Sequence, residues 1–267
     1  PKATKKPLST SKHPKHAKTT SQHVPPNSLS IIKGRSMCPR CHHELAAKDL
    51  IPVVSWLSLR GKCRYCQQPI SAQYPVVELA TAGLFVASYL WWPQTLAGAH
   101  VVTFGLWLAL LTGLMALLVY DARWYLLPNR IMYPLGALAA VLACVVAAQA
   151  AHPWQAVLNT VLAVGVGGGI FYLLFQVSGG KWIGGGDVKL GWLLGLVAAT
   201  PARGLLLIFM AAVGGSLISV PLLASGRLKR DSMIPFGPFL IVAAIIVQLF
   251  GAGILRWYQH VFLGIST

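Results

Sequence analysis

The chain is poor in charged residues and especially poor in acids. Charged residues make up 10% of its 267 positions, with six acids against 22 lysines and arginines. Soluble domains usually carry about a quarter charged residues, so this composition excludes an ordinary soluble globule. Hydrophobic residues account for 55% of the chain. We therefore expect a body that lies within a lipid bilayer.

The positive charges are concentrated near the N-terminus. Thirteen of the 22 lysines and arginines precede residue 65, and nine are scattered over the rest of the chain. Residues 1–36 are rich in Lys, His, Ser, Thr and Pro, which is typical of a disordered basic tail. This tail lacks the apolar core that a signal peptide needs. The sequence thus predicts a basic, polar head on a membrane-embedded body.

Seven apolar stretches of spanning character follow the head, each bounded by polar residues, glycine or proline. They cover approximately 76–92, 101–120, 131–150, 155–177, 188–201, 204–225 and 236–258. Short connections join the first six, which favours a helical bundle threaded up and down through the bilayer. The predicted fold class is an all-α polytopic membrane protein with about seven transmembrane helices. We assign 1–36 to the tail, 37–75 to a small four-cysteine domain and 76–260 to the membrane domain.

The distribution of lysine and arginine between the connections predicts the orientation. Alternating crossings place seven basic residues on the side of the basic head, which we assign to the cytoplasm: Arg123, Arg130, Lys181, Lys189, Arg227, Lys229 and Arg230. The outer connections contain one basic residue, Arg203. The stretch 188–201 is short for a crossing. A re-entrant dip there would move the last three basic residues outside, so we predict a crossing.

Four of the five cysteines form two C-x2-C pairs. Cys38 and Cys41 make the first pair, and Cys63 and Cys66 make the second after 21 intervening residues. Each pair can direct two sulfurs toward one point, so two pairs supply the four corners of a tetrahedral site. We expect zinc in a structural role, with a rubredoxin-like iron or two disulfides as the alternatives.

Other residues near the cysteines and inside the stretches have simpler interpretations. His42 and His43 adjoin Cys41, and we expect them beside the metal or in solvent, because four thiolates are already available. Cys144 falls inside an apolar stretch, where we expect an inert packing residue. Close helix packing is the expected role of the glycines inside the stretches: Gly165, Gly167, Gly168, Gly169, Gly214 and Gly215.

Beyond Glu78 at its very start, the membrane body contains three carboxylates: Asp121, Asp187 and Asp231. Acids within or at the edge of a membrane are costly and therefore suggest a function. Asp121 closes the second apolar stretch, and Asp187 opens the fifth after a run of glycines. The threading places both at one depth, where an ionised carboxylate can activate water and a protonated one can polarise a scissile amide. Alternatively, each acid caps a helix or pairs with Arg123 or Lys189. We expect Asp231 to be a solvated loop acid.

Several motifs, in order and spacing, resemble those of the bacterial type IV prepilin peptidases. The matching segments are Cys38–His43, Ile51–Pro52, Ser55–Leu57, Leu59–Cys66, Pro69–Ser71, Tyr74–Glu78, Asp121 with Pro128-Asn129, Gly184–Leu190 and Ile234–Leu240. The GxGD motif alone would be weak, since other intramembrane aspartyl proteases share it. Agreement of several independent motifs over residues 38–240 makes the resemblance specific.

The resemblance implies a GxGD-type leader peptidase of the bacterial cytoplasmic membrane. Such enzymes cleave the basic leader of prepilins or pseudopilins after a glycine at the cytoplasmic face. Many also methylate the new N-terminus with S-adenosylmethionine. Carried over to this chain, Asp121 and Asp187 are the catalytic aspartates, Gly184, Gly186 and Lys189 belong to the supporting motif, and the four paired cysteines are zinc ligands.

One segment departs from the family pattern. The family usually begins with a further apolar span, carrying a Gly-Ser-Phe-Leu-like stretch, directly before the cysteines. Here the basic tail occupies that place, so either the chain is N-terminally incomplete or this member lacks the span. Proteolysis remains the expectation, because both aspartates lie downstream. We make no firm expectation of methylation, because the head shows no glycine-rich loop that would bind S-adenosylmethionine.

Two other classes of function remain open. A non-enzymatic membrane scaffold would bind nucleic acid through its zinc ribbon and tail, and it would not need Asp121 or Asp187. A proton-coupled transporter would place the same two acids along a solute path. We expect no nucleic-acid partner, because topology and contact with anionic lipid explain the excess positive charge.

Overall fold

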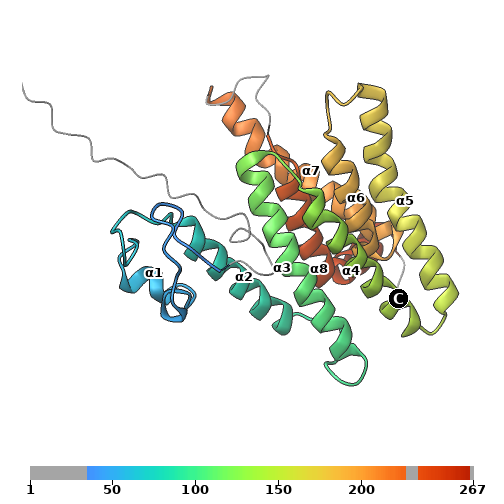
Figure 1. Cartoon of the computed structure of the whole chain (residues 1–267). Helices are drawn as coiled ribbons and strands as arrows, with labels where there is room; N and C mark the ends of the chain where they lie inside the picture. The colour runs from blue at the N-terminus through green and yellow to red at the C-terminus, as the bar shows by residue number, and fades with distance from the viewer. Residues whose placement is uncertain (1–34, 227–233, 265–267) are drawn as a thin grey trace, which may run out of the picture. The chain divides into compact units, whose positions relative to one another are not determined.

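The structure is a computed structural model that describes residues 35–226 and 234–264 (Figure 1). The chain divides into two compact units, Pro1–Ala72 and Gln73–Thr267. The predicted basic tail, up to residue 34, lies outside the described residues. The same holds for Arg227, Lys229, Arg230 and Asp231.

The first unit contains two tight turns, here called knuckles, each built around one cysteine pair. An antiparallel β-bridge closes each knuckle, between Met37 and Glu44 in the first and between Lys62 and Pro69 in the second. Two short helices, η2 (Ala47–Asp49) and α1 (Val54–Ser58), lie between the knuckles in the chain.

The two knuckles share one backbone pattern. The first cysteine donates its N–H to the carbonyl five residues later and accepts a hydrogen bond from the N–H four residues later. The four bonds are Cys38 N to His43 O (3.0 Å), His42 N to Cys38 O (2.9 Å), Cys63 N to Gln68 O (2.9 Å) and Gln67 N to Cys63 O (2.9 Å). His42 and Gln67 occupy equivalent left-handed positions, with φ of 56° and 58°. Both pairs of thiols are therefore presented by the same kind of turn.

The second unit is helical throughout its described residues, and each predicted apolar stretch forms one helix. The seven helices are α2 (Gln73–Leu90), α3 (His100–Trp124), α4 (Asn129–Ala148), α5 (Pro153–Ser178), α6 (Gly185–Ala198), α7 (Pro201–Ala224) and α8 (Gly237–Leu263). The described residues of the whole chain form helices, turns and isolated bridges, without a β-strand. The predicted all-α fold class is confirmed.

Five of these helices are long and apolar enough to cross a membrane, namely α3, α4, α5, α7 and α8. By comparison, α2 has 18 residues and α6 has 14, and neither is among the five. The chain is thus a multi-pass membrane protein. The count of seven crossings stays a prediction.

Proline, threonine and left-handed residues set the helix boundaries. Pro153 and Pro201 open α5 and α7, where a missing N–H costs nothing because the first-turn donors have no partner within the helix. The Thr200 hydroxyl caps α7 by accepting a hydrogen bond from the Arg203 N–H at 3.4 Å. At its far end α5 stops at Gly179, with φ of 57°.

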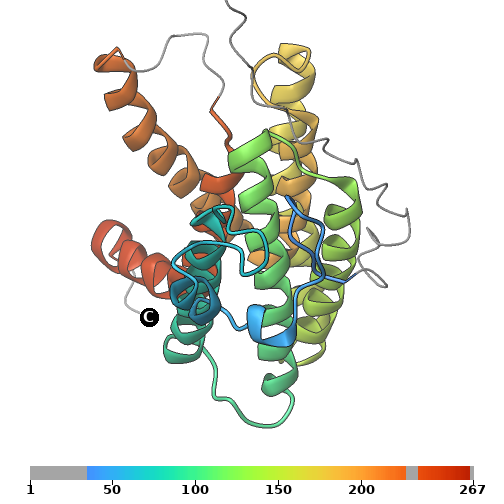
Figure 2. The same ribbon diagram turned by 60° about the vertical axis from the view of Figure 1, so that its left-hand side comes forward.

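The short helix α6 lies among other helices. It contacts α4, α5, α7 and α8, and it runs beside α5 in both views (Figures 1 and 2). Its side chains Leu190, Leu193 and Leu194 are buried. Because protein covers much of α6, its 14 residues do not have to match the thickness of the lipid by themselves.

Glycines allow α5 and α6 to approach at the level of their backbones. A Cβ on Gly191 would lie 2.8 Å from the Gly167 carbonyl oxygen, and one on Gly195 would lie 2.6 Å from Val164 Cα. A Cβ on Gly168 would collide with Trp192. Two of the predicted packing glycines, Gly167 and Gly168, therefore lie in this contact.

The other glycines predicted to serve packing are less constrained. Gly214 and Gly215 on α7 lie at ordinary contact distance from Phe239 on α8, 3.8 and 3.6 Å from the position of an added Cβ. Gly165 and Gly169 on α5 have nothing within 4 Å of an added Cβ among the described residues. The packing prediction is wrong for these last two positions.

The centre of the membrane unit is formed largely by α3 and α8. Leu110, Leu114 and Leu117 of α3 and Leu240 and Ile241 of α8 are fully buried. Contact between α3 and α8 brings the end of one helix beside the start of the other. That junction is where Asp121 lies.

Candidate active site and metal centre

Asp121 lies near the C-terminal end of α3 and is buried, with 6% of the residue exposed. The start of α8 packs directly against it. A Cβ built on Gly237 would collide with Asp121 Oδ2 and lie 3.1 Å from its Cγ, so a glycine is needed there. Oδ2 is buried and has no hydrogen-bond partner among the described residues. A buried carboxyl oxygen without a partner is costly and calls for a functional explanation.

Asp187 lies in the first turn of α6 and is half-buried. Its N–H donates to the Gly184 carbonyl at 3.0 Å, and its Oδ2 is 3.5 Å from the position of a Cβ on Gly184. The carboxylate thus folds back over the start of the helix, where the helix dipole favours negative charge. It also lies close enough to Asp121 for the two charges to interact. The fold therefore brings together two acids that are far apart in the sequence.

Gly186 packs the start of α6 against the connection between α3 and α4. A Cβ at this position would lie 3.2 Å from Leu127 Cδ1 and 3.3 Å from Leu127 Cβ, which is tighter than side chains usually pack. The glycine run before Asp187 therefore lies beside the residues that follow Asp121. Gly184 and Gly186 of the supporting motif are both at the site.

The basic residues near the aspartates have other partners. Lys189 Nζ donates to Asn129 Oδ1 at 2.9 Å, which ties the start of α6 to the start of α4. The Arg123 guanidinium donates to Gln73 Oε1 and lies 5.5 Å from the centroid of its neighbouring Trp124 ring. No ion pair between described residues involves either aspartate. Charge pairing with Arg123 or Lys189 is therefore not the role of these acids, although Asp187 does lie at a helix N-terminus.

The four paired thiols converge in the first unit. The Sγ atoms of Cys38, Cys41, Cys63 and Cys66 all lie within 4.8 Å of one another. The Sγ atoms of Cys38 and Cys66 are 3.9 Å apart. A tetrahedral zinc ion with Zn–S bonds of about 2.3 Å separates its sulfurs by roughly 3.8 Å, so this donor set fits zinc. All four cysteines are free thiols, and the disulfide alternative is wrong.

The thiols of the cluster differ in acidity. Burial raises the pKa of Cys38, but hydrogen bonds from the backbone of Cys41 and Arg40 outweigh it, so that the pKa falls to about 7. A backbone hydrogen bond from Gln68 lowers the pKa of Cys66. Burial and hydrogen bonds with the other thiols outweigh this effect and raise that pKa to about 12. A bound divalent cation would stabilise all four thiolates.

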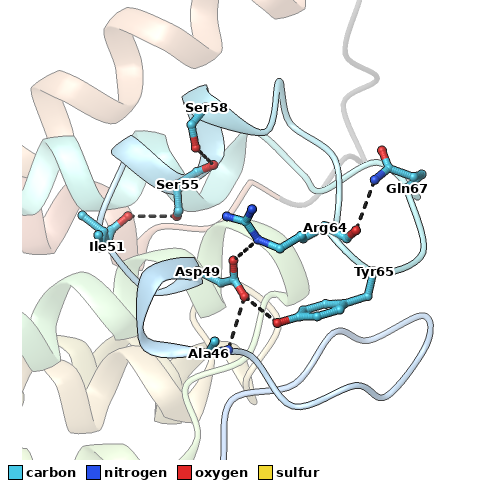
Figure 3. A network of polar contacts seen from close by, with 8 residues as sticks. All are labelled: Ala46, Asp49, Ile51, Ser55, Ser58, Arg64, Tyr65 and Gln67. Carbon is cyan, nitrogen blue, oxygen red and sulfur yellow. Dashed lines mark hydrogen bonds and ion pairs between the residues drawn. The ribbon is translucent and has the colours of Figure 1, made fainter.

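Asp49 holds the second knuckle in place (Figure 3). Its carboxylate accepts hydrogen bonds from Arg64 Nε at 2.7 Å and from the Tyr65 hydroxyl at 2.9 Å, the two residues inside the second cysteine pair. The Ala46 N–H donates to the same carboxylate at 3.3 Å. The Asp49 side chain is 4% exposed. The hydrogen bond from Arg64 is the main reason that the pKa of Asp49 lies below its ordinary value.

The remaining candidate ligands lie outside the thiol cluster. The His43 ring packs on Tyr65 with a centroid separation of 3.7 Å, and His42 is exposed. Cys144 is exposed on α4, so the prediction that it packs within the bundle is wrong. The reason is that lipid is as apolar as a helix interface, and an apolar stretch does not show which face looks inward.

Comparison with known proteins identifies the family. The model of the bacterial peptidase A24 N-terminal domain matches residues 15–92, and that of the type IV leader peptidase family matches residues 108–220. The Prepilin leader peptidase/N-methyltransferase of Aeromonas hydrophila is 36% identical over 242 residues, which cover 90% of this chain and 79% of that protein. The chain belongs to the type IV leader peptidase family.

Other members of the family are similarly related. The Bacillus subtilis protein of the same name is 31% identical over 239 residues, covering 90% of this chain and 91% of that protein. The Dichelobacter nodosus protein is 32% identical over 244 residues, covering 89% of this chain and 78% of the relative. No solved structure matches the chain.

Two residues at the site of this leader peptidase family member had no role in the sequence analysis. Asn129 accepts the hydrogen bond from Lys189, and Gly237 leaves room for the Asp121 carboxylate. Both fall within segments that carry the family resemblance. Their roles depend on which helices pack together, and the spacing of motifs along the chain does not contain that information.

Proposed function

We propose that this protein is a membrane-embedded aspartic endopeptidase that removes the leader peptide of prepilin-like proteins at the cytoplasmic face of the inner membrane. The observation that carries the proposal is the approach of Asp121 and Asp187 from the ends of two different helices. The name of its relatives, Prepilin leader peptidase/N-methyltransferase, supports the substrate class.

The two carboxylates would share one proton, because neighbouring like charges oppose a second ionisation. The ionised carboxylate takes a proton from water, and the water oxygen attacks the carbonyl carbon of the scissile amide. The protonated carboxyl meanwhile gives its proton to the carbonyl oxygen. When the C–N bond breaks, the first carboxyl protonates the nitrogen, and a hydroxyl proton of the diol returns to the second carboxylate. One water is consumed, and the pair regains its starting state.

The proposed arrangement in the membrane follows from the positions of the acids. Asp121 ends α3 and Asp187 begins α6, so both lie at the ends of helices that the charge bias assigns to the cytoplasm. The apolar segment of a prepilin would stay in the bilayer while its basic leader remains in the cytoplasm. We propose the domains as a basic tail (1–36), a zinc domain (37–75) and a peptidase domain (76–260).

Zinc would be held by Cys38, Cys41, Cys63 and Cys66. A closed set of four thiolates leaves no open coordination position, so the ion would stabilise the small first unit. We propose a structural role for it and assign hydrolysis to the aspartates alone.

For S-adenosylmethionine we assign no binding residues. Two cavities of the second unit, of about 280 and 430 Å³, are lined mostly by apolar residues and by no carboxylate that could hold ribose hydroxyls. We therefore derive no methylation step for this chain. The test below measures methylation directly.

The proposal is tested by incubating membranes that contain the full chain with a prepilin and S-adenosylmethionine, and reading the mass of the product N-terminus. Asp121→Asn and Asp187→Asn should each lower leader cleavage by about 10²–10⁴-fold, because each removes one proton-transferring group. Asp231→Asn is the matched control, since we expect that acid to be solvated, and it should cleave normally. An added methyl group on the product would establish the second activity.

Normal cleavage by either single aspartate variant, inserted at the wild-type level, would refute the proposal. A scaffold that binds nucleic acid predicts that both variants behave as wild type and that substitution of the N-terminal lysines is harmful. A transporter predicts that solute-coupled proton flux is lost in the two variants, without any cleavage of prepilin by the wild-type chain.

A further inference from the structure

A cavity lies at the end of the helices opposite to the two aspartates. It has a volume of about 280 Å³ and is lined from α3, α4, α6, α7, α8 and the connection after α2. Thr103 of its lining and Asp121 are both on α3, 18 residues apart, or roughly 27 Å at 1.5 Å per residue. The volume is several times the roughly 30 Å³ that one water occupies in the liquid. The cavity is therefore separate from the proposed active site and large enough for a ligand group.

Among the described residues that line this cavity, Arg203 is the one that carries a charge. Its guanidinium has no ion pair or hydrogen bond with any described residue, and its N–H bond to Thr200 involves the backbone alone. Its stem runs beside α8, 3.9 Å from the position of a Cβ on Gly251. A half-buried cation without a counter-ion is costly, so this cavity favours an anion.

Trp92 also belongs to the lining of the same cavity. Its indole N–H is buried and has no hydrogen-bond partner among the described residues. The ring itself is fixed by Phe104 and Trp107, at centroid separations of 5.1 and 6.3 Å. A buried tryptophan N–H normally has a partner, and a small turn of the Trp92 ring toward the cavity would let it donate to a bound acceptor. The amide side chains of Gln94 and Gln248 are also part of the lining.

A second cavity, of about 430 Å³, adjoins the first and shares Pro93 and Ala252 with it. The rest of its lining is apolar apart from Arg256: Leu249, Phe250, Gly253 and Ile254. Phe250 is 39% exposed, so this cavity reaches the outer surface of α8. Cationic and N–H donors in one cavity and apolar side chains in the next match a molecule with an anionic head and a hydrocarbon tail.

We propose that the Arg203 cavity binds the phosphate group of an anionic phospholipid, whose acyl chains leave along the second cavity. The planar guanidinium can donate two parallel hydrogen bonds to a phosphate, and basic pockets between membrane helices are suited to lipid head groups. Lipid is favoured over free phosphate because the first cavity is lined from several membrane-spanning helices and the second, along α8, is largely apolar. The site also gives a role to Arg203, which lies in the first turn of α7. It does not depend on the proposed peptidase function.

The first measurement is the unfolding midpoint of the purified full chain in phosphatidylcholine nanodiscs with and without phosphatidylglycerol. The second is the number of lipids that the chain retains in detergent, counted by native mass spectrometry. Phosphatidylglycerol should raise the unfolding midpoint of the wild type. Arg203→Gln should bind this lipid about tenfold more weakly and lose most of the shift, because the charge-assisted bonds to phosphate are gone. Arg203→Lys should lie between the two, since lysine is a point charge without the planar fork.

The matched control is Lys48→Gln, which removes the same charge from an exposed position in the first unit and should keep full binding. Equal effects of phosphatidylglycerol on the wild type and Arg203→Gln would overturn the proposal. Equal losses in Arg203→Gln and Lys48→Gln would also overturn it, because they would indicate a general charge effect. Stabilisation by inorganic phosphate as large as that by the lipid would overturn the lipid as occupant.

A second variant keeps the test decisive if Arg203→Gln does not insert. Trp92→Phe retains the ring and removes only the indole N–H. It should weaken phosphatidylglycerol binding while leaving the unfolding midpoint in pure phosphatidylcholine close to that of the wild type. Unchanged lipid binding in this variant would count against the site.

Discussion

At the scale of single residues, the candidate active site depends on how closely a backbone can approach a carboxylate. Asp121 and Asp187 could be selected from the sequence because acids are rare in the membrane body. Gly237 could not be selected from the sequence, because its role is to leave room for the Asp121 carboxylate by having no side chain. Its contact with Asp121 arises only when α8 packs against α3.

Gly237→Ala should therefore impair the proposed cleavage. The added methyl would collide with Asp121 Oδ2 and displace the carboxylate, and a misplacement of about 1 Å can cost roughly 100-fold in rate. The measurement is leader cleavage in membranes at matched protein levels. Gly136→Ala on α4 has open space around the new methyl among the described residues and should cleave normally. A fully active Gly237→Ala would show that Asp121 tolerates displacement.

A second residue-scale prediction concerns Asp49, which supports the second knuckle. Asp49→Asn should weaken zinc binding by about tenfold, as loss of a group that orients metal ligands typically does. Because the pKa of Asp49 is lowered, its contribution is complete above the ordinary aspartate pKa of about 3.9 and is lost as the pH falls through the folded value. The affinity gap between wild type and variant should therefore be constant from neutral to mildly acidic pH.

Zinc competition with a chromophoric chelator measures this gap. Glu44→Gln is the control, because Glu44 pairs with Arg35 at the surface, where an ion pair contributes little. Equal zinc affinities of Asp49→Asn and the wild type would show that the second knuckle holds its shape without the carboxylate.

At the scale of helices, the sequence predicted all seven elements of the membrane unit because proline, glycine and polar residues separate the apolar stretches. It could not predict how far neighbouring helices enclose each of these elements. The hydrophobic content of α5 and α6 is similar, but α6 has four helical neighbours. The contact between these two helices depends on Gly167, Gly191 and Gly195, whose backbones touch the facing helix.

Gly195→Leu should destabilise the membrane unit by about 1–3 kcal/mol or more, since the new side chain meets the α5 backbone 2.6 Å from its Cβ. It should also reduce cleavage, because α6 carries Asp187. Gly165→Leu on α5 makes the same chemical change at a position with nothing within 4 Å among the described residues, and it should be tolerated. Thermal unfolding in detergent compares the two variants. Equal midpoints would contradict backbone packing as the basis of this contact.

At the scale of the whole molecule, two units with different sources of stability are joined in one chain. The membrane unit has a core of large apolar side chains, whereas the first unit has a four-thiol cluster and few buried residues. The cysteine spacing was sufficient to predict that cluster, because two C-x2-C pairs leave few geometric solutions. The exposed position of Cys144 was not predictable, because composition does not distinguish a lipid-facing surface from a helix interface.

The purified full chain should contain about one zinc ion, and Cys63→Ser should reduce its zinc content to near zero. Cys144→Ser should leave it unchanged, since that cysteine lies outside the cluster. Elemental analysis gives the zinc content, and thiol titration gives the number of reactive cysteines. A wild-type chain without zinc and with all of its thiols freely reactive would contradict the structural metal site.

The short length of α6 affects how water can reach Asp187 at its start. A helix of 14 residues rises about 21 Å, whereas the hydrocarbon layer is about 30 Å thick. Neighbouring helices cover much of α6, so the difference of roughly 9 Å leaves a recess above its end that solvent can enter below the surrounding lipid surface. Such solvent wets the end of the helix that carries a carboxylate. The water that the proposed hydrolysis consumes would then reach the carboxylate through a recess that the short helix itself creates.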